Sequence, residues 1–281
     1  MSTSKFDANA KINLGLEILG RRPDGFHEIN TVFAKISLAD EILLKPSGKL
    51  QVTVEPELDI PEHENLVYIA AEKIKNIYDL QGSGAEIHVR KNIPHSAGLG
   101  GGSSDAAVTL IGLSNMWNLT ISENEYERIA LEIGSDVPYF LRHGAAVGRG
   151  RGENLEYFDL DFPFSILLVS PGINISTKWA YQSLGMTADT KNAADFKNTV
   201  LQAKNNPSVL KDGLFNDFEQ IVFKEFPKLA EIKEQLYSSG AIYSQMTGSG
   251  STIFGVFPDD DTSRKAASLF PDFDCNVCHL I

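Results

Sequence analysis

A glycine-rich loop is the part of the chain whose residue types most directly suggest chemistry. It reads "PHSAGLGGGSSDAA" over residues 94–107, between an alternating segment, "AEIHVRKNI", and an apolar helical segment. Glycines let a ligand approach the backbone closely, and the N–H groups of a helix start favour an anion, phosphate above all. Ser103 and Ser104 are good helix-cap residues, and their hydroxyls can face an oxygen ligand. The spacing leaves two interpretations open, an anion-binding helix start and a purely structural tight turn.

The loop departs from the better-known glycine motifs. A Walker loop ends in Gly-Lys-Ser/Thr, but no lysine lies between Lys91 and the helices that follow. In a dinucleotide fingerprint Ser103 stands where the third glycine belongs, and a second helix follows instead of an acid-ended strand. Neither serine satisfies the G-x-S-x-G pattern of a nucleophile elbow. Backbone amides are then the main ligands, and a cation must come from outside the loop.

Strands and helices must position this loop. In "KINLGLEI" Lys11 and Asn13 share one face of a predicted strand, and further strands follow up to "LQVTVEPE". A helix is predicted in "ENLVYIAAEKIKNIYDL", and two helices follow the loop. From about residue 160 we expect a buried strand, a short helix in "TKWAYQSL", one helix over residues 214–240, a strand–turn–strand unit and a final strand. Residues 186–213 are polar and predict a helix or a mobile connection.

Composition narrows the class of protein. The 281 residues carry a net charge of −12, which argues against a nucleic-acid partner. Cys275 and Cys278 lack a second ligand pair, so they are weak evidence for zinc and suit a reducing compartment. We see no signal peptide and no apolar run approaching the ~18 residues of a membrane span, so a cytoplasmic protein with no membrane partner is expected.

Four separated blocks resemble one family. "PHSAGLGGGSSDAA" resembles the second motif of the GHMP kinases, and "MTGSGSTIFGVF" resembles their third. "NAKINLGLEILGRRPDGFHEI" and "IGSDVPYFL" resemble the branch of that family that serves the non-mevalonate isoprenoid route. The resemblance covers nearly the whole chain. It implies an α+β fold with a ribosomal-S5-domain-2-like ATP-binding half over residues 1–158, a ferredoxin-like half over 159–281, and the active site in the cleft between them.

The same resemblance implies the reaction. It is ATP-dependent phosphorylation of the 2-hydroxyl of 4-diphosphocytidyl-2-C-methyl-D-erythritol, with Mg²⁺ expected beside ATP. Asp136 would accept the hydroxyl proton and Lys11 would stabilise the developing charge. The residues alone favour a helix N-cap for Asp136 and a solvated lysine on an edge strand for Lys11. The magnesium ligands are not specified; Ser104 is a candidate, and Asp105 is a possible acid.

The resemblance also implies binding residues. The ATP set comprises the loop and an "NLV" segment bordering adenine: Asn65, Leu66, Val67, Pro94, His95, Ser96, Ala97, Gly98, Leu99, Gly100, Gly101, Gly102, Ser103 and Ser104. The substrate set comprises cytosine contacts and a glycine turn over the substrate's phosphates: Asn13, Phe26, His27, Thr177, Tyr181, Gly248, Ser249 and Gly250. Many relatives carry Tyr at the position of Phe26, which here lacks the hydroxyl. Trp179 is the alternative to Tyr181 as the second stacking ring.

Two other functions remain open at this stage. One is a GHMP kinase acting on an alcohol without a nucleotide, against which the predicted aromatic contacts argue. The other is a catalytically silent nucleotide-binding regulator, against which the presence of both Lys11 and Asp136 argues. The expected partner is a small molecule carrying a cytidine diphosphate, and the expected assembly is a monomer or weak homodimer.

Overall fold

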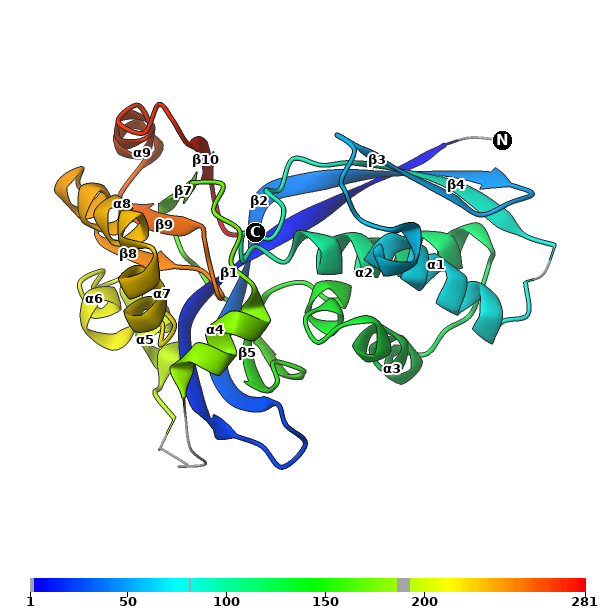
Figure 1. The fold of residues 1–281 in the computed structure, drawn as a ribbon, viewed down its shortest axis with the longest axis horizontal. Coiled ribbons are helices and arrows are strands. Elements are labelled where there is room, and N and C mark those ends of the chain that lie inside the picture. Colours follow the sequence, from blue (N-terminus) through cyan, green and yellow to red (C-terminus); the bar gives the residue numbers. More distant parts are fainter. Residues whose placement is uncertain (1–2, 81, 186–192) are drawn as a thin grey trace. The chain divides into compact units, whose positions relative to one another are not determined.

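The computed structural model describes residues 3–80, 82–185 and 193–281 (Figure 1). The chain divides into two compact units that are interleaved along the sequence. Unit 1 comprises residues 1–10, 38–95 and 100–143, and unit 2 comprises residues 11–37, 96–99 and 144–281. Two long strands, β1 (Ser4–Arg21) and β2 (His27–Ser47), contribute residues to both units.

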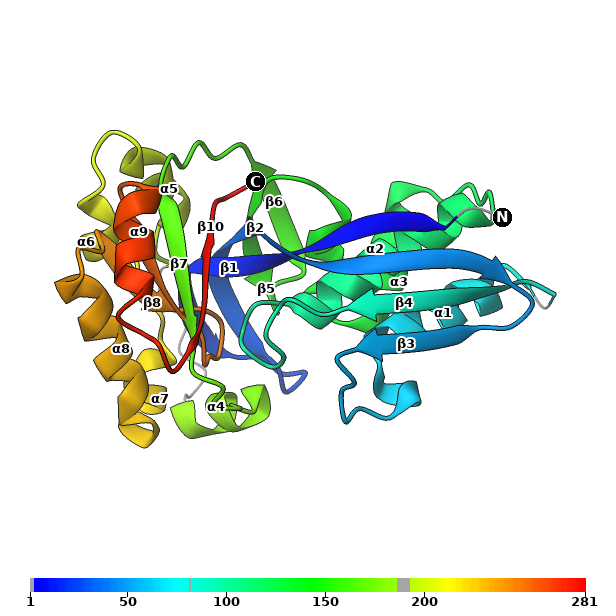
Figure 2. The same cartoon turned by 90° about the horizontal axis from the view of Figure 1, so that it is seen from above.

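Unit 1 is a small sheet covered by helices. Its part of β2 pairs antiparallel with β4 (Gly84–Arg90), which pairs in parallel with β3 (Gln51–Glu55). Helices α1 (Leu66–Ile77) and α2 (Gly101–Met116) pack against each other on one face of these strands (Figures 1 and 2). The unit also contains the beginning of β1 and three further helices, η1 (Glu62–Glu64), α3 (Glu123–Ile133) and η2 (Val137–Leu141).

Local sequence explains where these helices begin. The Asn65 side chain accepts a hydrogen bond from Val67 N at 2.9 Å and caps α1. The prediction that Ser103 or Ser104 caps α2 is wrong, because the N-cap is Gly100 in the left-handed region at φ 70°. Glycine is the residue that adopts this conformation without steric cost.

Unit 2 combines two sets of strands. Ile29–Phe33 of β2 pairs with β5 (Ala145–Gly150), and β5 pairs with β6 (Asn154–Phe158). A second, antiparallel sheet has the order β10-β7-β9-β8 and consists of β7 (Ser165–Ser170), β8 (Tyr243–Met246), β9 (Ile253–Phe257) and β10 (Asp274–Cys278). Helices α8 (Pro227–Ser238) and α9 (Asp260–Ala267) pack on this sheet (Figure 2). The remaining helices are α4 (Thr177–Leu184), α5 (Phe196–Ala203), α6 (Val209–Gly213) and α7 (Glu219–Glu225).

The prediction of one helix over residues 214–240 is wrong. The chain forms α7 and α8, which are interrupted at Phe226. Pro227 opens α8 because proline has no N–H for an interior helical bond and is accommodated in a first turn. Strands β5 and β6 were not predicted. Within residues 186–213 the structure places α5 and α6, and residues 186–192 lie outside the described part.

Across the described ranges, no helix combines the length and the apolar character needed to cross a bilayer. The α+β class predicted from the sequence is confirmed, with mixed strands and helices throughout. The division at residue 158 stays a prediction.

Candidate functional site

A buried lysine on β1 forms the centre of the first group of predicted site residues. Lys11 is 4% exposed, which excludes the solvated edge-strand interpretation. Its ammonium donates to Asn13 Oδ1 at 2.7 Å and to the carbonyl oxygen of Gly98 at 3.1 Å, and it lies 5.4 Å from the centre of the Phe33 ring. Two oxygens and an aromatic face therefore hold one positive charge in a largely desolvated place.

Two threonines complete this group. Thr31 Oγ1 accepts from Asn13 Nδ2 at 2.9 Å. Thr247 Oγ1 accepts from Asn13 N at 3.1 Å and donates to the Gly98 carbonyl at 3.3 Å. We call Lys11, Asn13, Thr31, Thr247 and Gly98 the Lys11 cluster. All belong to unit 2, and all but Gly98 are buried.

Gly98 is packed tightly against the turn that follows β8. It adopts φ +80°, and a Cβ there would lie 2.2 Å from the Thr247 carbonyl oxygen. Thr252 N also donates to the Ala97 carbonyl at 3.3 Å. The first part of the glycine-rich loop thus packs against the turn at residues 247–250 through backbone contacts. Glycines are required at such positions because a side chain would not fit between the two backbones.

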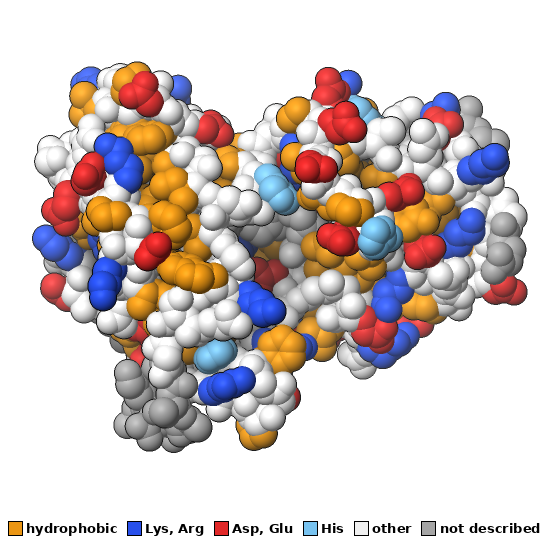
Figure 3. Space-filling model, in the orientation of Figure 1, with side chains coloured by type: hydrophobic (Ala, Val, Ile, Leu, Met, Phe, Trp, Pro, Cys, Tyr) orange, Lys and Arg blue, Asp and Glu red, His pale blue; other side chains and the backbone are white. Residues whose placement is uncertain are grey.

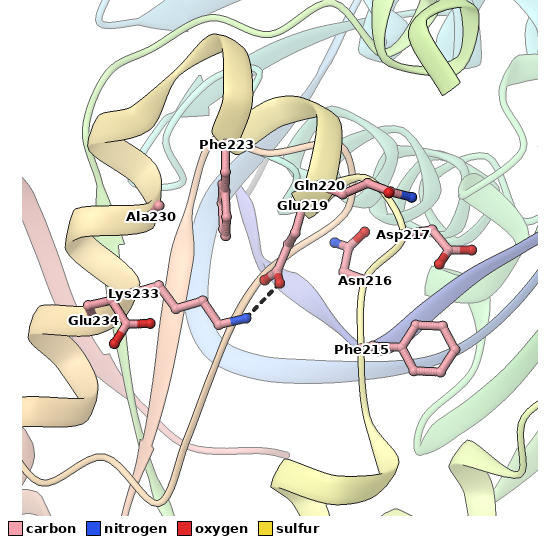
Figure 4. A pocket seen from close by; sticks show the side chains of 9 residues that line it. All are labelled: Phe215, Asn216, Asp217, Glu219, Gln220, Phe223, Ala230, Lys233 and Glu234. Atoms are coloured by element: carbon pink, nitrogen blue, oxygen red, sulfur yellow. Dashed lines mark hydrogen bonds and ion pairs between the residues drawn. The ribbon is translucent and has the colours of Figure 1, made fainter. Parts of the chain in front are cut away.

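The turn at residues 247–250 is supported from behind by Asn216. Its Nδ2 donates to the carbonyls of Met246 at 2.7 Å and Gly248 at 2.9 Å. Glu219 Oε1 accepts from Met246 N at 2.8 Å, and its other oxygen pairs with Lys233 at 2.6 Å (Figure 4). Polar groups from the α7 region therefore fix the backbone on which the predicted substrate residues Gly248, Ser249 and Gly250 stand.

Asn216 and Glu219 also line a hollow of about 470 Å³ in unit 2 (Figure 4). Its remaining walls are Phe215, Asp217, Gln220, Phe223, Ala230, Lys233 and Glu234. On the face of unit 2 that carries α7 and α8, hydrophobic side chains gather among charged ones (Figure 3). None of the predicted site residues lines this hollow, so it is separate from the predicted site.

The second part of the glycine-rich loop starts α2 in unit 1. The first intrahelical bond runs from Ser104 N to the Gly100 carbonyl at 2.9 Å, so the amides of Gly101, Gly102 and Ser103 precede it. The N-cap is glycine and offers these amides no side-chain oxygen. This is the arrangement of an anion-binding helix start.

Beneath this helix start lies a buried ion-pair network that the sequence did not predict. The Lys91 ammonium pairs with Asp40 and with Asp105, the latter at 2.7 Å. Asp40 also accepts from the amides of Asn92 at 2.6 Å and Ile93 at 2.8 Å. Burial alone would lower the pKa of Lys91, but the two carboxylates raise it, so this lysine stays charged. Burial raises the pKa of the Asp105 carboxyl against the pull of Lys91.

The two magnesium candidates do not fit a metal site. Asp105 is 3% exposed and engaged by Lys91, and Ser104 is 1% exposed. Mg²⁺ prefers open carboxylate oxygens with room for several waters. Among the described residues, no group of three His, Cys, Asp or Glu side chains could hold a metal ion.

Asp136 and the predicted adenine residues also belong to unit 1. Asp136 is partly exposed and immediately precedes η2. Its side chain makes no capping hydrogen bond to the described residues of this helix. The simple N-cap interpretation is therefore not supported. Asn65, Leu66 and Val67 form the start of α1, so the capping role of Asn65 stands beside any role in adenine binding.

The predicted cytosine contacts meet in unit 2. The rings of His27 and Tyr181 stack directly, with centroids 4.6 Å apart and planes 19° apart. Phe26 is 50% exposed, and the Arg151 guanidinium lies 4.4 Å from its ring centre. Trp179 instead packs edge-on against Phe226 at 5.8 Å. The geometry thus favours Tyr181 over Trp179 as the partner of the Phe26-His27 segment.

The pKa values of two histidines and a contact between two hydroxyl groups bear on the predicted binding roles. Partial burial lowers the pKa of His27, with a contribution from Arg21, which favours the neutral form of its ring. Partial burial and Lys91 likewise lower the pKa of His95, which weakens it as a cation for phosphate. Thr177 Oγ1 and Ser249 Oγ lie 2.9 Å apart, so two predicted substrate residues are brought together.

The sequence did not predict a role for four residues of this region, namely Thr31, Thr247, Asn216 and Lys91. Only Thr247 carried a signal, since it opens the "TGSGST" segment. The others form no motif with their neighbours in sequence, and their importance depends on partners far away in sequence, such as Asp40, 51 residues from Lys91.

Comparison with known proteins now places the chain. It matches the GHMP kinases N terminal domain over residues 65–144 and the GHMP kinases C terminal domain over residues 199–271. A relative from Prosthecochloris aestuarii, named 4-diphosphocytidyl-2-C-methyl-D-erythritol kinase, is 42% identical over 95% of this chain and 93% of its own. The chain belongs to the GHMP kinase family.

Solved GHMP kinase structures agree in fold. A structure of 4-(cytidine 5'-diphospho)-2C-methyl-D-erythritol kinase aligns with a TM-score of 0.83 and 31% identity over 99% of both chains. A homoserine kinase from Cytophaga hutchinsonii aligns with a TM-score of 0.69 and 17% identity, covering 100% of this chain and 98% of its own. The second likeness concerns the fold alone. The resemblance to this family that the four sequence blocks predicted is confirmed.

Proposed function

We infer that the chain is an ATP-dependent kinase that phosphorylates the 2-hydroxyl of 4-diphosphocytidyl-2-C-methyl-D-erythritol, giving the 2-phosphate and ADP in the non-mevalonate isoprenoid route. The observation that carries this inference is the 42% identity over 95% of the chain to a relative named for that substrate. The 31% identity to the matching solved structure, against 17% for the homoserine kinase, favours this branch of the family.

ATP is proposed to bind through the glycine-rich loop. The amides of Gly101, Gly102 and Ser103 at the start of α2 would donate hydrogen bonds to oxygens of the triphosphate, with Pro94 to Gly100 and Ser104 forming the rest of the loop site. Asn65, Leu66 and Val67 would border adenine. Backbone N–H groups at a helix start suit a phosphate because they meet it with positive partial charge and need no reorganisation.

Phosphoryl transfer is proposed to use Lys11 and Asp136. The acceptor oxygen attacks the terminal phosphorus, the bond to the bridging oxygen of ADP breaks, and Asp136 takes the hydroxyl proton. Lys11 would stabilise the negative charge of the transferred group. Its burial supports that role, because a fixed ammonium in a place of low dielectric interacts strongly with a developing charge.

The cytosine is proposed to bind at the aromatic group of unit 2. A neutral His27 offers one ring nitrogen as donor and one as acceptor, which complements the edge of cytosine. Phe26 and Tyr181 would supply the stacking faces, and Asn13, Thr177, Gly248, Ser249 and Gly250 would complete the substrate site. A base inserted between two rings needs them about 7 Å apart, twice the ~3.5 Å contact distance. The centroids of the His27 and Tyr181 rings lie only 4.6 Å apart, so a base would not fit between these two rings.

The remaining assignments are proposed on general grounds. Mg²⁺ would enter with ATP as the counterion of its phosphates, and we assign it no ligand in this chain. Residues 1–158 and 159–281 would be the two family domains, and the matched ranges fall on either side of that boundary. We propose that the enzyme is cytoplasmic, and the two free cysteines support this compartment. We propose that it is a monomer or a weak homodimer.

A coupled ADP-release assay tests the substrate. Turnover is expected with the cytidyl substrate and not with homoserine, galactose or mevalonate, and CDP but not AMP should compete at the acceptor site. Equal turnover with mevalonate would support the alternative of another GHMP kinase. If no alcohol caused ADP release, the alternative of a catalytically silent regulator would be supported. Asp136→Asn should lower kcat by at least about 100-fold while leaving the unfolding midpoint unchanged. A near wild-type rate would remove Asp136 from the mechanism.

A further inference from the structure

The side-chain amide of Asn13 lies between two groups with opposite hydrogen-bonding requirements. Its Oδ1 accepts from the Lys11 ammonium at 2.7 Å, and its Nδ2 donates to Thr31 Oγ1 at 2.9 Å. An ammonium only donates, so the amide must present oxygen to Lys11. If the amide turned over, its NH₂ would face the ammonium, and two donors would oppose each other.

Thr31 fixes this orientation from the Nδ2 side of the amide, as the Lys11 ammonium does from the Oδ1 side. Its hydroxyl is fully buried on β2 and donates to the Gly15 carbonyl at 2.6 Å. A hydroxyl has a single hydrogen, so toward Asn13 it can act only as an acceptor. The carbonyl of Gly15 thereby sets the direction of the Thr31 hydroxyl, and the hydroxyl sets the direction of the Asn13 amide. The chain of hydrogen bonds ends at the ammonium of Lys11.

We propose that Thr31 is a positioning residue for phosphoryl transfer, acting through the Asn13 amide to hold the Lys11 ammonium in one place. The proposal rests on the proposed function of Lys11. Thr247 supports the same arrangement from the other side, because its hydroxyl accepts from the Asn13 backbone and its single hydrogen is within reach of both Asn13 Oδ1 at 3.4 Å and the Gly98 carbonyl that Lys11 also contacts. The position of the catalytic charge is thus determined by hydroxyl groups that need not touch either substrate.

Thr31→Val tests the proposal, since valine has nearly the same shape and lacks the hydroxyl. The Asn13 amide then loses its acceptor and can turn over. The expected result is a fall in kcat of about 10- to 100-fold with the KM for ATP within about 2-fold, because misplacement of about 1 Å costs up to about 100-fold in rate. Thr31→Ser keeps the hydroxyl and is expected to retain at least half of the wild-type kcat. Equal kcat in the two variants would overturn the proposal.

A double variant separates positioning from a purely structural effect. In the Asn13→Asp background both side-chain oxygens accept, so the orientation that Thr31 fixes no longer matters. Adding Thr31→Val there should not lower kcat further, because the Thr31 oxygen can accept nothing from the new carboxylate, whereas a structural role of Thr31 would lower kcat as much as in the wild-type background. If Thr31→Val does not fold, judged by its unfolding midpoint, Thr31→Ala replaces it in the same comparisons.

Lys11→Ala distinguishes the proposal from the function it rests on. If Lys11→Ala retains wild-type kcat with ATP and the cytidyl substrate, the proposed role of Lys11 fails and the proposal fails with it. If Lys11→Ala abolishes turnover but Thr31→Val equals Thr31→Ser, only the positioning role of Thr31 fails. If both variants lose turnover and the Asn13→Asp background removes the effect of Thr31→Val, the proposal holds.

Discussion

Replacing Gly98 with alanine would place a methyl group where a backbone carbonyl already lies. The new Cβ would be 2.2 Å from the Thr247 carbonyl oxygen, whereas ordinary contact begins at 3.4 Å. The two backbones would have to separate by about 1.2 Å, since neither atom belongs to a flexible side chain. The position also has φ +80°, so the alanine is strained even after the backbones separate.

The size of the effect follows from these distances. The left-handed conformation costs an alanine about 1–2 kcal/mol. The Gly98 carbonyl accepts from Lys11 at 3.1 Å and from Thr247 at 3.3 Å, and a shift of that size takes both beyond hydrogen-bonding reach. At about 1 kcal/mol for each lost bond, the free energy of unfolding should fall by roughly 3–4 kcal/mol. Because Lys11 loses an anchor, kcat should fall by about 100-fold.

Urea unfolding and coupled ADP release measure the two effects, and the chain offers matched controls. Gly48→Ala has nothing within 4 Å and should match wild type in both assays. Gly102→Ala, in the same loop but on α2, meets Leu66 at an ordinary 3.7 Å and should unfold at the same or a higher urea concentration. A Gly98→Ala protein as stable and as active as Gly48→Ala would refute the reasoning.

Three further predictions concern other residues. Protonation of His27, whose pKa lies below its usual value, should raise the KM for the cytidyl substrate as pH falls below ~6.5, while the KM for ATP stays constant; a parallel rise in both would contradict this. Burial lowers the pKa of Lys35 to about 8, so below that pH the folded state carries a buried ammonium whose desolvation lowers its stability. Lys35→Met should therefore stabilise the protein by up to about 3 kcal/mol at pH 7 and by less at pH 9, measured by urea unfolding; an equal gain at both pH values would count against it. Asn216→Asp turns a donor that serves the Met246 and Gly248 carbonyls into an acceptor, so it should cost about 3 kcal/mol in urea unfolding and raise the KM for the cytidyl substrate; an unchanged midpoint would exclude the assigned role.

The strand that carries Lys11 illustrates what the sequence could predict. Alternation correctly placed Lys11 and Asn13 on one face of β1. It could not predict that this face is buried, because the partners that bury it, Thr31 and Thr247, lie 18 and 234 residues from Asn13. A polar strand face has the same sequence pattern whether it meets water or a hydrogen-bonding partner.

The glycine-rich loop shows a similar limit. Its place between a strand and a helix, and its suitability for an anion, followed from local composition. The choice of Gly100 rather than a serine as N-cap did not, because three consecutive glycines allow several starting points and only the packed backbone selects one. The absence of a lysine from the loop argued against a Walker motif, but the pairing of Lys91 with Asp40 could not be predicted, because it depends on a contact between distant segments. The break at Phe226 had a local signal in Pro227, which the apolar periodicity on both sides obscured.

The interleaving of the two units has a consequence for synthesis on the ribosome. Unit 1 needs residues only as far as 143, whereas unit 2 combines residues 11–37 with residues 144–281. The β2 segment Ile29–Phe33 must therefore wait for β5, more than 100 residues later, and Ser37 N bonds to the carbonyl of His279. At about 5–20 residues per second, these early strands remain without their final partners for several seconds or more. The segment that carries Lys11 and Asn13 is thus made long before the residues that complete its surroundings, such as Thr247.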